Sequence, residues 1–188
     1  MPDHELFELG DVVLQSGITL RQAKIAYKTY GKLGPSRDNV IVMPTFYGGP
    51  HVDTEAMMGS GRALDPGRYF IIVPNMFGNG LSSSPSNTPP PLDRAAFPNI
   101  TLYDNVVCQH RLVMEHLGID RIKLVVGFSM GAQQAFQGVR CILRWSGPLR
   151  RFAVPLAPLP TITCSWTVLR QHCTPMVHLK TAGTKLRR

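Results

Sequence analysis

The sequence predicts an α/β fold with a largely parallel sheet, and three observations support this prediction. Short continuous apolar runs at 39–43, 69–73 and 122–126 are typical of strands that are buried on both faces of a sheet. Between the last two runs, apolar residues over 103–117 approximate a helical stripe. A Gly-x-Ser-x-Gly motif at 127–131 then leads from the third run into a second helix-like stretch. Strands that alternate with helices in this way indicate parallel pairing through crossover helices.

An antiparallel hairpin is predicted to precede the parallel strands. Apolar and polar residues alternate over 5–14 and again over 18–30, and a short turn-like stretch separates the two segments. The helix over 103–117 is expected to end at Gly118, because glycine is a common C-terminal stop. We expect Asp104 to lie on the solvated face of this helix.

Loops follow the carboxyl ends of the three buried runs, at 44–49, 74–80 and 127–131. In open α/β sheets ligands bind outside these strand ends, so we expect the three loops to meet at one site. The first loop can supply a backbone N–H to an oxyanion, and Phe46 is the candidate donor. His51 lies just past this loop and is expected to be a solvated histidine.

Residues 127–131 read Gly-Phe-Ser-Met-Gly and have the strand–turn–helix context of a nucleophile elbow. Such a turn lifts the Ser129 hydroxyl clear of the backbone, and Gly127 and Gly131 permit it because neither carries a Cβ. The N–H of Met130 lies at the start of the following helix, where it can donate to an oxyanion. Ser129 is therefore the candidate nucleophile.

A serine nucleophile needs a base and an acid, and neither is evident in this sequence. There is no Asp or Glu between Met130 and Arg188. The chain order Ser, acid, His leaves only His172 and His178 as bases, and without an acid to orient them both are expected to be incidental. No set of His, Cys or acidic residues has the spacing of metal ligands, so neither a metal nor a cofactor is predicted.

The charge of the chain changes abruptly near residue 137. Residues 1–137 hold 11 Lys and Arg against 12 Asp and Glu, whereas residues 138–188 hold nine Lys and Arg and no acid. This asymmetry predicts two parts, a folded part over 1–137 and an irregular basic tail over 138–188. The tail lacks spaced aromatic and basic residues, which disfavours nucleic-acid binding, and a tail that binds polyanions stays as the alternative.

Neither a membrane nor a secretory destination is indicated. No apolar run approaches the roughly 20 residues that span a bilayer. The first fifteen residues are acidic and polar, unlike a signal peptide. Together with four cysteines that fit reduced thiols, these features predict a cytoplasmic protein without a membrane partner.

Over about residues 5–137 the chain resembles the homoserine O-acetyltransferase-like branch of the α/β-hydrolase superfamily. The similar stretches follow in order at 26–31, 44–49, 75–80, 97–105 and 127–136. The resemblance implies the N-terminal portion of an α/β-hydrolase fold, with Ser129 as a nucleophile that carries an acyl group. It also implies Met130 and Phe46 as oxyanion donors, a small acyl donor such as an acyl-coenzyme A, and a hydroxyl acceptor. Intact members of the family are often homodimers.

The chain departs from the acetyltransferases at two places. Their elbow usually reads Gly-Gly-Ser-Met-Gly-Gly, whereas here Phe128 precedes the serine and Ala132 ends the motif. Their oxyanion loop usually begins with His, where Pro44 stands in this chain. An ester hydrolase of the same branch is therefore the alternative to an acyltransferase.

The resemblance ends at Gln137, and a shifted reading frame is the hypothesis that explains why. Back-translation of residues 138–168 in one shifted frame permits A-V-Y-P-E-M-V and later C-G-S-A-R-T-S-P-H-N-H-V-F-L-D-G. Both segments resemble the continuation of the family. On this hypothesis the chain is truncated as a family member, and we expect the sequence as printed to be catalytically inactive.

Overall fold

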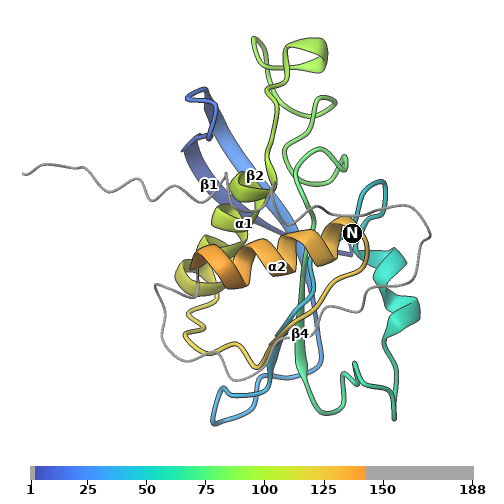
Figure 1. Ribbon diagram of the computed structural model, residues 1–188. Helices are drawn as coiled ribbons and strands as arrows, with labels where there is room; N and C mark the ends of the chain where they lie inside the picture. The colour runs from blue at the N-terminus through green and yellow to red at the C-terminus, as the bar shows by residue number, and fades with distance from the viewer. Residues whose placement is uncertain (1–2, 143–188) are drawn as a thin grey trace, which may run out of the picture. The chain divides into compact units, whose positions relative to one another are not determined.

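The computed structural model describes residues 3–142, which contain one mixed sheet and the helices beside it (Figure 1). The sheet has five strands in the spatial order β1-β2-β4-β3-β5. Its strands are β1 (Glu5–Val13), β2 (Thr19–Tyr30), β3 (Val40–Val42), β4 (Phe70–Pro74) and β5 (Leu124–Val125). The prediction of an α/β fold is confirmed.

The first two strands form the predicted antiparallel hairpin. β1 pairs with β2 so that Phe7 lies opposite Ile25, and two irregularities in register surround Gly10. Gly10 has a φ of 71°, a conformation that favours glycine and is typical of a bulge. β2 then pairs antiparallel with β4, which attaches the hairpin to the rest of the sheet.

The three buried runs form the predicted parallel strands. β3 lies between β4 and β5, with Ile41 opposite both Ile71 and Leu124. Successive side chains of β3 enter different clusters, since Val40 and Val42 pack in one core and Ile41 in another. Both faces of these strands are therefore buried, which explains why their sequences are continuously apolar.

One helix lies in the crossover connection between β4 and β5, and a second helix follows the serine motif. They are α1 (Leu102–Arg111) and α2 (Met130–Ile142), which lie beside each other (Figure 1). α1 is followed by a π-helical turn at Leu112–His116, and the helix stops at Gly118, where φ is 60°. Two short 3₁₀ helices, His51–Met57 and Arg94–Ala96, lie in the connections.

The expectation that Asp104 is solvated is wrong. The residue is 4% exposed and completes a capping box with Thr101 at the start of α1. Its carboxylate also accepts a hydrogen bond of 2.7 Å from the backbone N–H of Gln15. A carboxylate in the first turn favours the positive end of the helix dipole, so the acid caps the helix rather than facing water.

The predicted boundary at residue 137 falls inside α2, which continues to Ile142. The remainder of the predicted tail, residues 143–188, lies outside the described residues, and the division of the chain stays a prediction. Within residues 3–142 no helix is long and apolar enough to cross a bilayer.

His110, near the end of α1, makes the stability of the fold depend on pH. Its Nε2 atom is buried without a hydrogen-bond partner among the described residues, and burial lowers the pKa of the imidazole below 6.5. The unfolded chain therefore binds this proton more readily than the folded chain does. Stability from His110 should be fully present above pH 6.5 and should fall as the pH drops below that value.

Urea unfolding of the chain at pH 8 and pH 5 measures this dependence. We expect the His110→Leu variant to lose less stability between the two pH values than the parent chain does, because leucine cannot be protonated. Equal losses in the two proteins would show that His110 does not contribute.

Candidate active site

Ser129 lies in a sharp turn between β5 and α2. Its φ is 49°, a left-handed conformation that costs a non-glycine residue about 1–2 kcal/mol. The residue is exposed, so the turn presents its hydroxyl at the surface rather than in the core. This is the strand–turn–helix context that the sequence motif predicted.

The glycines on either side of the turn are required by close backbone contacts. A Cβ on Gly127 would lie 2.2 Å from the carbonyl carbon of Gly131. A Cβ on Gly131 would lie 2.5 Å from the carbonyl oxygen of Pro44. Backbone atoms cannot move aside as a flexible side chain does, so only glycine fits at either position.

The three loops at the strand ends meet, as predicted from their positions. Gly131 contacts the 44–49 loop through Pro44. The N–H of Met76, in the second loop, donates to the Thr45 hydroxyl at 3.0 Å. The carboxyl ends of β3, β4 and β5 therefore share one edge, with Ser129 at it.

Two backbone N–H groups near the turn are free to bind a ligand. Within residues 3–142, no hydrogen bond uses the N–H of Met130, the first residue of α2, or the N–H of Phe46. The N–H at a helix start has no intrahelical partner and carries the positive end of the dipole. These are the two groups that the resemblance assigns to an oxyanion.

Aromatic side chains stand beside Ser129. The rings of Phe46 and Phe128 meet edge to face, with centroids 5.5 Å apart and planes at 81°. The Phe46 ring packs over Gly49, where a Cβ would lie 2.5 Å from it. The ring pair therefore connects the 44–49 loop to Phe128, the residue before Ser129.

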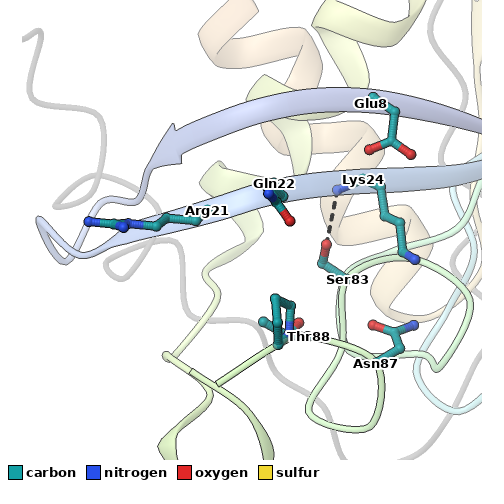
Figure 2. A pocket seen from close by; sticks show the side chains of 8 residues that line it. Glu8, Arg21, Gln22, Lys24, Ser83, Asn87 and Thr88 are labelled. Atoms are coloured by element: carbon teal, nitrogen blue, oxygen red, sulfur yellow. Dashed lines mark hydrogen bonds between the residues drawn. The ribbon is translucent and has the colours of Figure 1, made fainter. Parts of the chain in front are cut away.

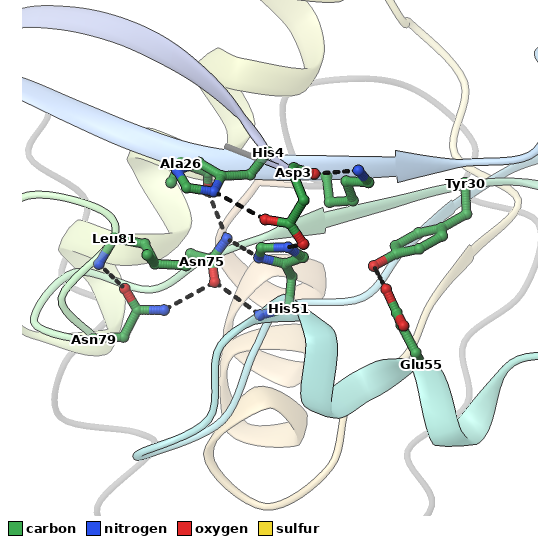
Figure 3. Close-up of polar contacts among 10 residues, drawn as sticks. Asp3, His4, Ala26, Tyr30, His51, Glu55, Asn75, Asn79 and Leu81 are labelled. Carbon is green, nitrogen blue, oxygen red and sulfur yellow. Dashed lines mark hydrogen bonds and ion pairs between the residues drawn. The ribbon is translucent and has the colours of Figure 1, made fainter. Parts of the chain in front are cut away.

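His51 is buried, and the expectation that it is solvated is wrong. It is 2% exposed, and Asn75 binds it twice (Figure 3). The Asn75 side chain accepts from the His51 backbone N–H at 2.9 Å and donates to the Ala26 carbonyl at 3.1 Å. Since these two bonds fix the orientation of the amide, its nitrogen must face His51 Nδ1, which lies 3.2 Å away.

This network assigns the proton of the neutral His51 ring. Nδ1 accepts from Asn75, so the proton is on Nε2, which donates to the Asp3 carboxylate at 3.2 Å. Hydrogen bonds from His51 and then His4 lower the pKa of Asp3. The contact ties the start of the chain to the segment that follows the 44–49 loop.

Asp3, His4 and His51 also form a group that the sequence analysis missed. One potential ligand atom from each lies within 4.8 Å of the others. A metal ion bound at Nε2 of His51 would replace the proton on that nitrogen. Because Nδ1 accepts from Asn75 and carries no proton, the ring would then be an imidazolate anion. The arrangement therefore does not fit a metal ion, and 48 residues separate Asp3 from His51, so no local pattern could reveal it.

No histidine in the described part of the chain is hydrogen-bonded to Ser129. His4 and His51 belong to the Asp3 network, and His116 Nε2 lies 3.0 Å from the Tyr27 hydroxyl. His172 and His178 lie outside the described residues.

A polar hollow of about 270 Å³ is separate from these loops (Figure 2). Ser83 contributes a hydroxyl that accepts from the Lys24 backbone N–H at 2.9 Å. None of the predicted site residues lines it. Its lining consists of Glu8, Arg21, Gln22, Lys24, Ser83, Asn87, Thr88 and Pro89.

The sequence pattern of the alpha/beta hydrolase fold family matches residues 38–138, and the chain belongs to this family. The ethyl acetate hydrolase of Pseudomonas veronii is 43% identical over 134 residues, 71% of this chain and 38% of that enzyme. A homoserine O-acetyltransferase of Chlorobium chlorochromatii is 39% identical over 132 residues, 66% of this chain and 37% of that enzyme.

The solved structure of the acetyl esterase MekB agrees with this assignment. It has a TM-score of 0.75 at 39% identity and aligns with 80% of this chain and 43% of its own. The chain thus spans less than half the length of each of these three proteins. The relatives include homoserine O-acetyltransferases, as the resemblance implied, and esterases as well.

Proposed function

We propose that this chain carries the nucleophile half of a serine esterase for short acyl esters. The observation that supports it best is the left-handed turn at Ser129 between two free backbone N–H groups, those of Met130 and Phe46. Such a turn exposes a hydroxyl, and two aligned N–H donors stabilise the charge that develops on an acyl oxygen.

The reaction proceeds in two steps. The Ser129 oxygen attacks the ester carbonyl and gives its proton to a general base, and the oxyanion accepts hydrogen bonds from Met130 and Phe46. Collapse breaks the ester bond, and the alcohol leaves with the proton. Water then attacks the acyl-serine, which releases the acid and restores the hydroxyl.

Hydrolysis is favoured over acyl transfer by two observations. Identity is higher to an ethyl acetate hydrolase than to the homoserine O-acetyltransferase, 43% against 39%. Pro44 also occupies the loop position where the acetyltransferases usually have histidine. Acetyl transfer from an acyl-coenzyme A to a hydroxyl acceptor is the second candidate, supported by the relatives of that name.

We further propose that the 188-residue chain by itself does not catalyse repeated rounds of ester hydrolysis. No Asp or Glu follows Ser129 in the sequence, and no histidine within residues 3–142 is hydrogen-bonded to Ser129. A shifted frame after Gln137 accounts for the missing acid and base, and polyanion binding by residues 138–188 is the competing explanation for their basic composition.

Covalent trapping tests the role of Ser129. We expect a fluorophosphonate to label the chain slowly but to completion at Ser129, because an oxyanion site alone retains about 10³- to 10⁴-fold catalysis over water. Peptide mass spectrometry locates the adduct, and the Ser129→Ala variant is the control. An adduct spread over several serines, or none after prolonged exposure, would contradict the proposal.

A further inference from the structure

A buried glutamine pair connects α1 and α2 to the 44–49 loop. Gln134 of α2 is 1% exposed, and its Nε2 donates to the carbonyl oxygen of Thr45 at 2.9 Å. Its Oε1 accepts from Nε2 of Gln109 on α1 at 2.7 Å, and Gln109 is 5% exposed. Because the Thr45 carbonyl can only accept, it fixes the Gln134 amide with its nitrogen toward Thr45, and the Gln134 oxygen then accepts from Gln109.

The bond to Thr45 determines the direction of a neighbouring N–H. The Thr45 carbonyl and the Phe46 N–H belong to one planar trans peptide unit, so they point in opposite directions. Gln134 holds the carbonyl toward the buried side of α2, where Thr45 is 0% exposed. The Phe46 N–H therefore points away from this core, and no acceptor among residues 3–142 binds it.

The packing at the start of α2 leaves this peptide little freedom. Gly131 lies so close that a Cβ there would be 3.1 Å from the same Thr45 oxygen. Gln134 Nε2 also lies 3.4 Å from the carbonyl of Met130. The residue thus contacts both segments that carry the free N–H groups.

We propose that Gln134 is the positioning residue for the oxyanion donor at Phe46. This inference rests on the proposed function of Ser129. Rotation of the Thr45–Phe46 peptide would replace the N–H with a carbonyl at the acyl oxygen, and Gln134 prevents it. A buried amide is needed here because an apolar side chain could not hold the carbonyl.

Two variants of matched size separate positioning from packing. Gln134→Met keeps the length of the side chain but removes the donor to Thr45. Gln109→Met makes the same change at the other buried glutamine and leaves that donor in place. Both lose a buried hydrogen bond, so both are expected to be destabilised, and only the first should alter the Phe46 peptide.

The test uses the full 188-residue chain, labelled with ¹⁵N and ¹³C. In the free parent chain, NMR should detect a scalar coupling between Gln134 Nε2 and the Thr45 carbonyl carbon. After a fluorophosphonate reacts with Ser129, the Phe46 amide proton should shift downfield. Gln134→Met should lose most of this shift and react about 10²-fold more slowly, as when one oxyanion donor is removed. Gln109→Met should retain both properties.

The outcomes distinguish this inference from the proposed function. If the fluorophosphonate does not react with Ser129 of the parent chain, the proposed function fails. In that case no oxyanion forms at Ser129, and the proposed role of Gln134 fails with it. If the parent reacts but Gln134→Met shows the same Phe46 shift and rate, Gln134 only packs, and the inference alone is overturned. Absence of the coupling in the free parent chain would overturn it as well.

Discussion

A chain with its reading frame restored after Gln137 is expected to hydrolyse a short ester about 10⁶-fold faster than the 188-residue chain. In serine enzymes, loss of the base alone removes a factor of about 10⁶ in turnover, and further losses from the same catalytic group add little. The printed sequence has no acid after Ser129 that could orient a base. Turnover of p-nitrophenyl acetate by the two chains measures the difference.

Ser129→Ala in the restored chain is the control, and this substitution should abolish the increase in the rate of ester hydrolysis. Adding hydroxyl acceptors to the same assay separates the two candidate reactions, since only a transferase forms a new ester. Turnover by the printed chain at the restored rate would mean that a base is already present, and the interpretation of residues 138–188 would be wrong.

The largest effect on stability is expected from Gly127→Ala. The new methyl group would lie 2.2 Å from the carbonyl carbon of Gly131 and 2.6 Å from the N–H nitrogen of Ala132. Both are backbone atoms of the turn into α2, so relief requires the turn itself to open. We expect a loss of about 3 kcal/mol or more, the upper part of the range for overpacking.

Gly138→Ala provides the matched control for this substitution. A Cβ at Gly138 would lie 3.6 Å from Cγ1 of Val106, an ordinary contact, and the residue lies within α2. Alanine in a helix interior is about 1 kcal/mol more favourable than glycine, so this variant should gain stability. Urea unfolding followed by circular dichroism compares both variants with the parent. A Gly127→Ala variant as stable as the parent would show that the turn is not so tightly constrained.

The strands and the meeting of the loops could be predicted because they depend on local patterns. Alternating residues identified the hairpin, and continuous apolar runs identified the strands with both faces buried. The π-helical turn at Leu112–His116 was not predicted, because this rare i→i+5 hydrogen bonding occurs within a segment that the apolar residues already predicted as an ordinary helix.

The polar networks could not be predicted from the sequence. Asp3 precedes β1, His51 lies after β3 and Asn75 follows β4, so they are joined only when the pairing of β1, β2, β4 and β3 assembles the sheet. Likewise, Gln134 contacts a carbonyl 89 residues earlier in the chain. Single polar residues of this kind show no periodicity, and their partners are set by the tertiary structure rather than by neighbours in sequence.

At residue 129 the stability of the backbone and the reactivity of the side chain favour different residues, because the conformation there is left-handed. Glycine adopts this conformation without steric cost, so it would suit the backbone of the turn better than serine does. A designer who optimised this fold for thermal resistance alone would select glycine at residue 129 and thereby erase the reactive hydroxyl. The sequence that best stabilises this backbone is consequently not the sequence that gives it chemistry.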